Sequence, residues 1–261
     1  MNRGSVRRPV QTKIKLMQIN VDRKQVTQDV VFRRAYRDRT DILIINESNK
    51  KSLKRNEWYT DNRMDAALVV INGEMPVHGK GRGDGFVWLE LEEFVVYSCY
   101  CSPNIDKQSF EKYITDLGED VRKHSKDIVI DGDFNAKSAE WGSHTEDARG
   151  TIMMQWVSGS DLIVLNQGGC PTFVRYEQKS HIDVTLCTGG VAPRITNWKV
   201  LKEETIGWHR IIRFEYRKSQ RETNRSINGG WMINKERLVR FRENLDRKVA
   251  ADGGRWNTPC H

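Results

Sequence analysis

The stretch DIVIDGDFN, residues 127–135, decides the fold predicted for this chain. Its apolar first half predicts a strand that is buried on both faces, and its second half predicts a polar tip where the strand leaves the core. Gly132 lies between two acids, where a residue without a side chain allows another backbone to approach closely. Strand ends that gather carboxylate and amide groups are where sheet proteins build sites, so we place a candidate site at this end.

Nine other segments of the chain have strand patterns, and three have the spacing of amphipathic helices. The Glu92-Glu93 step between two of the strands predicts an antiparallel hairpin. The mixture favours a layered α/β sandwich over a doubly wound parallel sheet. The predicted strands are 14–20, 41–46, 66–71, 86–91, 94–100, 161–166, 181–187, 196–201 and 209–216, and the predicted helices are 25–38, 107–124 and 148–159.

Composition divides the chain of 261 residues into four predicted parts. These are a basic tail (1–12), one domain (13–216), a polar linker (217–230) and an amphipathic helix (231–261) that begins a missing downstream region. The longest apolar run is about six residues, whereas a membrane span needs about 20. We therefore expect no transmembrane segment, and the first residues have no apolar core typical of a secretory signal.

Charge and cysteine content indicate an intracellular protein with a polyanionic partner. Lysine and arginine number 43 and aspartate and glutamate 35, which gives a net charge of +8. A basic balance is typical of nucleic-acid binding, although solvated surface is the alternative explanation for any single cluster. The five cysteines form no Cys-x-x-Cys pair, so free thiols in a reducing compartment are expected.

Polar groups end several other predicted strands. Asn20 ends the first, with Asp22 just beyond, Glu47 follows the second, and Tyr100 ends a third. Asp183 lies inside an otherwise apolar strand, where an acid costs several kcal/mol unless it has a partner. His209 lies about 26 residues further on and is the candidate partner of Asp183, which would give an Asp–His pair. The alternative is that His209 has a purely structural role.

Six short motifs carry a resemblance to a known family. They are N-V-D (20–22), N-E-S (46–48), Y-x-S-P-N (100–104), G-D-F-N-A-K (132–137), S-H-I-D-V-T (180–185) and H-R-I-I (209–212). Together they resemble the apurinic-type endonuclease domain of insect non-LTR retrotransposons, within the endonuclease/exonuclease/phosphatase superfamily. The stretch GDFNAKSAEWGSHTEDARG (132–150) is the most specific part. The resemblance implies a four-layer α/β sandwich, with two mostly antiparallel sheets packed face to face and helices outside.

The resemblance also assigns roles to individual residues. It implies that Glu47, with Asp22 as a second ligand, holds Mg²⁺ or Mn²⁺, and that Asp133 orients or deprotonates the attacking water. Tyr100 and Asn135 would contact the scissile phosphate, while Asp183 and His209 would neutralise it. The catalytic set is Asn20, Glu47, Tyr100, Asp133, Asn135, Asp183 and His209, and the candidate DNA contacts are Lys137, Trp141, Arg149 and Arg210.

One residue departs from the family pattern. The family reads Ser-Asp-His before its last strand, whereas this chain reads Gly207-Trp208-His209. The missing acid is a metal-site group in the family, so its loss should weaken cation binding.

The resemblance implies a nuclear, monomeric Mg²⁺-dependent endonuclease that nicks one strand of double-stranded DNA. It would leave a 3′-hydroxyl that primes reverse transcription of a retrotransposon. Two alternatives stay open: a catalytically impaired copy that binds nucleic acid, or another phosphoesterase of the superfamily acting on a lipid, an inositol phosphate or RNA.

Overall fold

The computed structural model describes residues 12–52, 58–167, 169–202 and 206–219. Within these ranges, the first strand begins at Lys13 and the last ends at Arg217. The predicted helix at 231–261, most of the predicted linker and nearly all of the predicted basic tail lie outside the described residues. No helix within the described ranges is long and apolar enough to span a membrane.

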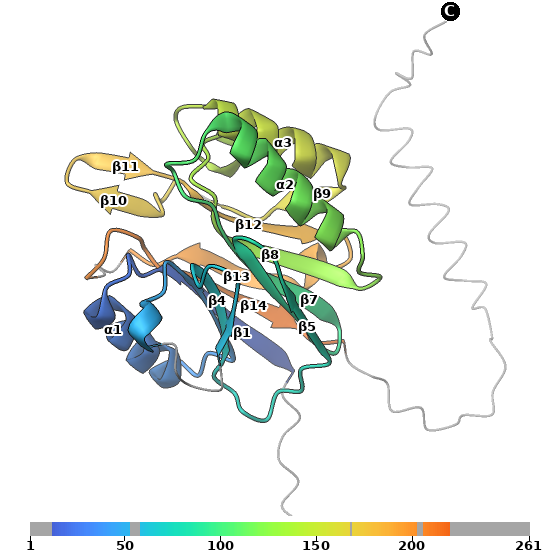
Figure 1. Ribbon diagram of the computed structural model, residues 1–261. Helices are drawn as coiled ribbons and strands as arrows, with labels where there is room; N and C mark the ends of the chain where they lie inside the picture. The colour runs from blue at the N-terminus through green and yellow to red at the C-terminus, as the bar shows by residue number, and fades with distance from the viewer. Residues whose placement is uncertain (1–11, 53–57, 168, 203–205, 220–261) are drawn as a thin grey trace, which may run out of the picture. The chain divides into compact units, whose positions relative to one another are not determined.

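Two six-stranded sheets form the centre of the fold (Figure 1). The first has the order β13-β14-β1-β2-β4-β3, and only its β1–β2 pair is parallel. Its strands are β1 (Lys13–Asn20), β2 (Ile42–Asn46), β3 (Trp58–Thr60), β4 (Ala66–Val70), β13 (Ile195–Val200) and β14 (Ile212–Arg217).

The second sheet repeats this plan with the order β5-β6-β7-β8-β12-β9, and only its β7–β8 pair is parallel. Its strands are β5 (Gly79–Arg82), β6 (Phe86–Glu90), β7 (Phe94–Tyr100), β8 (Asp127–Asp133), β9 (Leu162–Val164) and β12 (Asp183–Thr188). A separate hairpin pairs β10 (Phe173–Arg175) with β11 (Gln178–Ser180).

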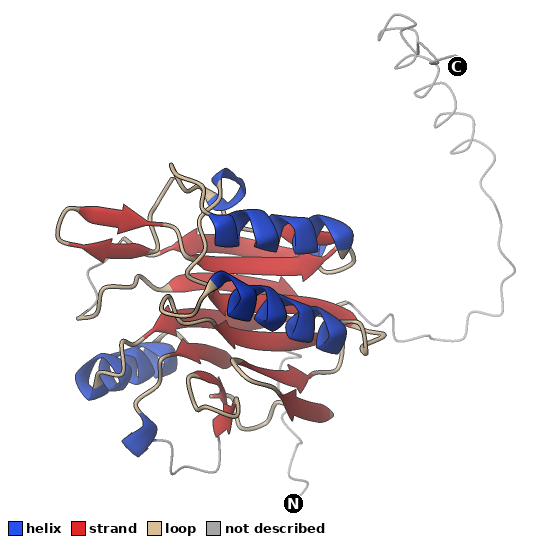
Figure 2. Ribbon diagram, turned by 45° about the horizontal axis from the view of Figure 1, so that its top comes forward, coloured by secondary structure: helices blue, strands red, loops and turns tan. Residues whose placement is uncertain are grey.

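Three apolar clusters give the fold four layers. One contains Leu16 and Ile44 from the first sheet with Val96 and Val129 from the second, so it lies between the sheets. The others lie under α1 (Gln25–Arg37) on one side and under α2 (Lys107–Val121) and α3 (Ala148–Gly159) on the other. Figures 1 and 2 show these helices on the outer faces of the paired sheets, which confirms the predicted sandwich.

All ten predicted strands are present, and four short strands were missed: β3, β5, β10 and β11. Each has only three or four residues, and two of them, GKGR and QKS, have no apolar residue, so they carry no hydrophobic pattern. The last predicted strand was also placed too early. His209 forms an isolated bridge with Phe173, and regular pairing begins at Ile212.

The loop that follows β8 is held by specific local contacts. The Asp147 side chain caps α3 by accepting from the Gly150 backbone at 2.8 Å, and it also accepts from the Lys137 backbone at 3.2 Å. A side chain at Gly150 would lie 1.9 Å from the Lys137 carbonyl oxygen. Likewise, a side chain at Gly132 would lie 1.9 Å from the Cys99 carbonyl oxygen, so this glycine is required where β8 runs beside β7.

Candidate catalytic site

The site lies where the two parallel strand pairs end. Asn20 ends β1 and Glu47 directly follows β2, while Tyr100 ends β7 and Asp133 ends β8, opposite each other in register. Because the carboxyl ends of parallel strands meet at one edge of a sheet, each sheet delivers two polar side chains to its edge. The packing of the two sheets then brings all four together.

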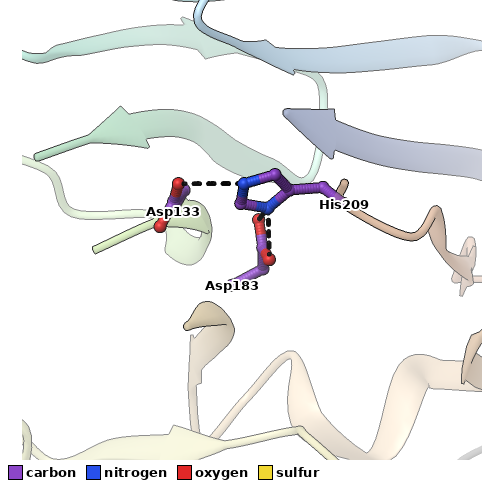
Figure 3. A group of neighbouring side chains, drawn as sticks. All are labelled: Asp133, Asp183 and His209. Carbon is purple, nitrogen blue, oxygen red and sulfur yellow. Dashed lines mark hydrogen bonds and ion pairs between the residues drawn. The ribbon is translucent and has the colours of Figure 1, made fainter. Parts of the chain in front are cut away.

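Asp133, Asp183 and His209 form the centre of this site (Figure 3). Nδ1 of His209 lies 2.9 Å from Oδ2 of Asp183, and Nε2 lies 3.8 Å from Oδ2 of Asp133. All three side chains are buried, and the Phe173 ring lies edge-on to the imidazole at 5.0 Å between centroids. The imidazole therefore bridges two acids in a site that excludes most water.

Asn20 connects this centre to Glu47. Its Nδ2 donates to Oδ2 of Asp133 at 2.8 Å and to Oε2 of Glu47 at 3.3 Å. The other oxygen of Glu47 accepts from the Tyr100 hydroxyl at 2.8 Å and lies 3.1 Å from the Arg23 guanidinium. Six of the seven residues predicted to be catalytic thus form one continuous network.

The electrostatics of the centre follow from burial and from its two acids. Burial and the nearby Asp183 charge together raise the pKa of Asp133. Burial alone would lower the pKa of His209, but the charge and hydrogen bond of Asp183 together with the charges of Asp133 and Asp22 outweigh it and raise this pKa to about 9. At neutral pH the imidazole is therefore protonated, and both of its nitrogens are donors.

Tyr100 keeps its proton across the physiological range. Burial, and then the negative charge of Glu47, raise the pKa of its hydroxyl far above the ordinary value. The hydroxyl is therefore a permanent donor that fixes the orientation of Glu47.

The seventh predicted catalytic residue, Asn135, lies just beyond Asp133 in the left-handed region, at φ +49°. Its backbone N–H donates to Oδ1 of Asp133 at 3.0 Å, and its side-chain amide donates to the Cys101 carbonyl at 3.1 Å. Asn135 therefore supports the Asp133 carboxylate through its backbone, while its side-chain amide bonds to the Cys101 carbonyl.

Gln18 and Asn46 also belong to the network, although neither was predicted to be catalytic. Gln18 Nε2 donates to Oδ1 of Asp183 at 3.0 Å and to Oδ1 of Asn46 at 2.9 Å, and both side chains are fully buried. Gln18, on β1 of the first sheet, is thereby linked to Asp183, on β12 of the second sheet. The sequence did contain a signal, because glutamine in the middle of the apolar strand IKLMQIN needs a buried polar partner.

The predicted metal ligands differ in their surroundings. Glu47 lies in the network, whereas the Asp22 carboxylate is bound by the Lys24 ammonium at 2.6 Å. Among the described residues, ligand atoms of Asp133, Asp183 and His209 lie within 4.8 Å of one another, but a protonated imidazole has no lone pair, so only the two carboxylates can hold an ion. Two buried carboxylates suit a hard divalent cation, which would relieve their mutual repulsion. The donor set of this chain therefore fits a metal at the centre.

Trp141 does not face the site, which corrects its prediction as a DNA contact. Its side chain is 1% exposed and packs under the loop after β8, where Nε1 donates to the Ala136 carbonyl at 3.1 Å. A buried indole cannot stack on a base. The tryptophan in the most specific stretch therefore holds the loop together.

Arg149 and Arg210 also serve the protein's own backbone. The Arg149 guanidinium donates to three carbonyl groups, those of Ser102, Pro103 and Ile105, at 2.6–3.1 Å. Arg210 Nη1 donates to the Pro171 carbonyl at 3.4 Å and lies 3.2 Å from Cys170 Sγ. Both side chains therefore hold loops beside the site. Lys137, the remaining predicted contact, is partly buried.

Trp208 lies at the rim, next to His209, and its indole contacts the Tyr176 ring in a tilted arrangement, at 5.4 Å between ring centroids. The Lys24 ammonium lies 5.0 Å from the centroid of the indole and the Arg175 guanidinium 5.5 Å. The Trp208 carbonyl accepts from the Val174 backbone at 2.8 Å. Trp208 thus packs against the β10–β11 hairpin and leaves the Asp183–His209 pair intact.

Two mixed sheets with buried acids at their common edge define an α/β sandwich of the endonuclease/exonuclease/phosphatase type. A family described as endonuclease-reverse transcriptase matches residues 94–213, which confirms the resemblance seen in the sequence. No curated protein matches the chain significantly.

Solved structures share this fold. The endonuclease domain of TRAS1, a telomere-specific non-LTR retrotransposon, has a TM-score of 0.69 and 24% identity, over 78% of this chain and 98% of that one. An AP endonuclease from Archaeoglobus fulgidus has a TM-score of 0.63 and 13% identity, over 78% and 99%. The 3′ phosphatase NExo from Neisseria, bound to a product DNA hairpin, has a TM-score of 0.58 and 15% identity, over 78% and 99%.

Proposed function

We propose that this chain is a divalent-metal-dependent DNA endonuclease that hydrolyses one strand of double-stranded DNA. The observation that carries the proposal is the buried group of Asp133, Asp183 and His209, joined by Asn20 to Glu47. It combines a proton acceptor, a protonated donor and carboxylates for a cation in one place. Hydrolysis of a phosphodiester needs these three functions.

Asp133 accepts the proton of the attacking water. Its raised pKa makes it a better base than an ordinary carboxylate, and the Asn20 amide and the Asn135 backbone fix its two oxygens. The water oxygen bonds to phosphorus as the bond to the 3′ oxygen breaks, and that oxygen takes up a proton. The products are a 5′-phosphate and a 3′-hydroxyl.

His209 stabilises the charge that develops on the phosphoryl oxygens. The imidazolium is held by Asp183 through Nδ1, so its Nε2–H is directed toward the space beside Asp133. A donor fixed before the reaction contributes about 2.7–4 kcal/mol to transition-state stabilisation.

The cation that fits the site is Mg²⁺, which prefers carboxylate oxygens. We propose Glu47 and the Asp133–Asp183 carboxylates as its holders. A bound Mg²⁺ supplies charge neutralisation at the phosphoryl and departing oxygens.

The biological role proposed for the chain follows the endonuclease domain that it resembles. The 3′-hydroxyl left by the nick would prime reverse transcription of a retrotransposon in the nucleus. Cysteines 99, 101 and 187 are buried free thiols, in keeping with a reducing compartment. We propose that a monomer binds the DNA, largely through its surplus of basic residues.

Nicking of a supercoiled plasmid tests the proposal. We expect Mg²⁺-dependent conversion to the open circle, and a 3′-hydroxyl at the nick that a polymerase extends directly. Asp133→Asn and His209→Gln should each slow nicking at least about 100-fold, whereas the exposed control Asp161→Asn should not. Equal rates for wild type and both site variants would reject the assignment, and hydrolysis of sphingomyelin or poly(A) without nicking would favour another phosphoesterase.

A further inference from the structure

A groove separates the free edges of the two sheets. β3 is the last strand of the first sheet and β5 the last of the second. The groove is lined by Trp58, Tyr59 and Thr60 on β3 and by Lys80, Gly81 and Arg82 on β5, and it has a volume of about 400 Å³. We refer to it as the edge groove.

The strand register directs the cations of β5 toward this groove. Lys80 pairs with Leu89 and Arg82 pairs with Val87, and directly paired residues lie on the same face of a sheet. Val87 and Leu89 belong to the core between the sheets. Lys80 and Arg82 therefore lie on the face of the second sheet that points toward the first sheet, just outside this apolar core. Gly81 faces the other way, because a side chain there would lie 2.5 Å from the Trp88 ring.

These cations have no carboxylate partner among the described residues. The Lys80 ammonium lies 5.3 Å from the centroid of the Tyr59 ring, and both Lys80 and Arg82 are exposed. The basic residues of the neighbouring cavity differ, since Arg63 pairs with Asp84 and Lys112 with Asp116. In the part of the chain that the structure describes, the positive charge of the edge groove thus has no carboxylate partner.

Tyr59 supplies the aromatic ring of the groove. It pairs with Leu68 and packs against the core between the sheets, on the face that Lys80 and Arg82 continue. Trp58 pairs with Val69 on the other face, where its ring packs on Phe32 at 5.3 Å between centroids. The Tyr59 ring remains partly exposed on the last strand of the sheet, and an aromatic ring beside cations is a combination that binds single-stranded nucleic acid.

One end of the groove leads to the catalytic site. β3 ends at Thr60 and β5 at Arg82, and the Asp61 carboxylate joins the loops that follow by accepting from the Gly85 backbone at 3.0 Å. In the first of these loops, the Asp65 carbonyl accepts from the Glu47 backbone at 2.6 Å. A strand that leaves the site on this side meets Arg82 before Lys80.

We propose that the edge groove binds a single-stranded segment of nucleic acid, with phosphates at Lys80 and Arg82 and a base against Tyr59. This contact lies outside the catalytic centre and does not require cleavage. The main alternative explanation is that Lys80 and Arg82 protect the free edge of the sheet, because lysine on an edge strand prevents sheets from pairing edge to edge. The two explanations predict different results when Lys80 and Arg82 are replaced: nucleic-acid binding predicts weaker DNA affinity, and edge protection predicts self-association.

Fluorescence anisotropy with a labelled single-stranded DNA of about 15 nucleotides tests the proposal. The full chain carries Asp133→Asn and Mg²⁺ is omitted, so that binding is measured whether or not the protein cleaves. We expect Lys80→Gln with Arg82→Gln to weaken binding about tenfold and to reduce the slope of log K against log salt by about 1.4, for two phosphate contacts.

A control variant removes the same charge elsewhere. It combines Lys123→Gln after α2 with Lys199→Gln on β13, the opposite edge of the first sheet, and should bind almost as wild type. Tyr59→Leu should weaken binding roughly tenfold with an unchanged salt slope, because it removes stacking and not charge. Circular dichroism checks that each variant is folded.

Two results would overturn the proposal. If the groove and control variants lose affinity equally, the effect is general charge attraction. If the groove variant binds DNA as wild type but elutes as larger species in size-exclusion chromatography, Lys80 and Arg82 only protect the edge.

Discussion

Nδ1 of His209 lies 2.9 Å from Oδ2 of Asp183, and the two residues are attached to different sheets. Asp183 begins β12 in the second sheet, while His209 precedes β14 in the first. Asn20 and Asp133 form a second such bridge, at 2.8 Å. The candidate site therefore exists only when both sheets are packed together.

The two shifted pKa values predict a bell-shaped dependence of nicking on pH. Activity falls as the pH drops below the raised pKa of Asp133, because the protonated acid cannot accept a proton from water. It falls again as the pH rises through about 9, where His209 loses its proton. The measurement is kcat/KM against pH at several Mg²⁺ concentrations. If Asp133 contacts the cation, the acid limb moves to lower pH as Mg²⁺ increases, and a limb that stays fixed would contradict that contact.

The same histidine makes stability depend on pH. Its folded-state pKa of about 9 lies above the ordinary value of 6.5, so the stabilisation is fully present below pH 6.5 and disappears as the pH rises through 9. The difference in unfolding free energy between wild type and His209→Gln, measured by urea denaturation, should therefore shrink over that interval. A difference that grows with pH would mean that the histidine is neutral in the folded protein.

Tyr100 orients Glu47, so we expect Tyr100→Phe to reduce nicking about 10–100-fold, as typically follows the loss of a group that supports a metal ligand. Tyr97→Phe is the matched control, because Tyr97 lies on the same strand but its hydroxyl donates to Asp120 at 2.8 Å. Initial rates over a range of Mg²⁺ concentrations provide the measurement. A similar loss in both variants would indicate damage to β7 and not a role at the site.

Trp208 occupies the position where the family has an acid. Trp208→Asp adds a carboxylate next to His209 at the rim of the site, and a partly exposed charge of this kind contributes about 1 kcal/mol, or roughly fivefold in Mg²⁺ affinity. The Mg²⁺ concentration for half-maximal nicking should fall accordingly, while Trp208→Phe, which keeps an aromatic ring at this position, should leave it unchanged. DNA binding without nicking in wild type and in Trp208→Asp would favour the impaired copy.

Trp141 contributes stability and not DNA affinity. Trp141→Ala should cost about 3–5 kcal/mol of unfolding free energy, because it empties a buried site and removes the bond to Ala136. Trp208→Ala, at a partly exposed position, should cost much less. Urea denaturation gives both values. Reduced DNA affinity in a Trp141→Ala protein of normal stability would restore the original prediction.

The strand and helix pattern of this chain was largely readable, because apolar runs such as DILIIN and the stripe in α2 specify a buried strand and a one-sided helix. The short strands β3 and β5, which line the edge groove, could not be predicted from the sequence. Their three or four residues are held by neighbouring strands and not by their own pattern, so local sequence carries no signal for them.

The sequence by itself determined the two-sheet fold and the polar strand ends, since burial of alternating and continuous apolar runs is a local property of the chain. Only the tertiary structure decided which polar groups meet. Asp133 and His209 converge because the sheets pack face to face, and Trp141 turns inward because the loop after β8 closes over it. Contacts between distant segments depend on packing geometry, which no single segment encodes.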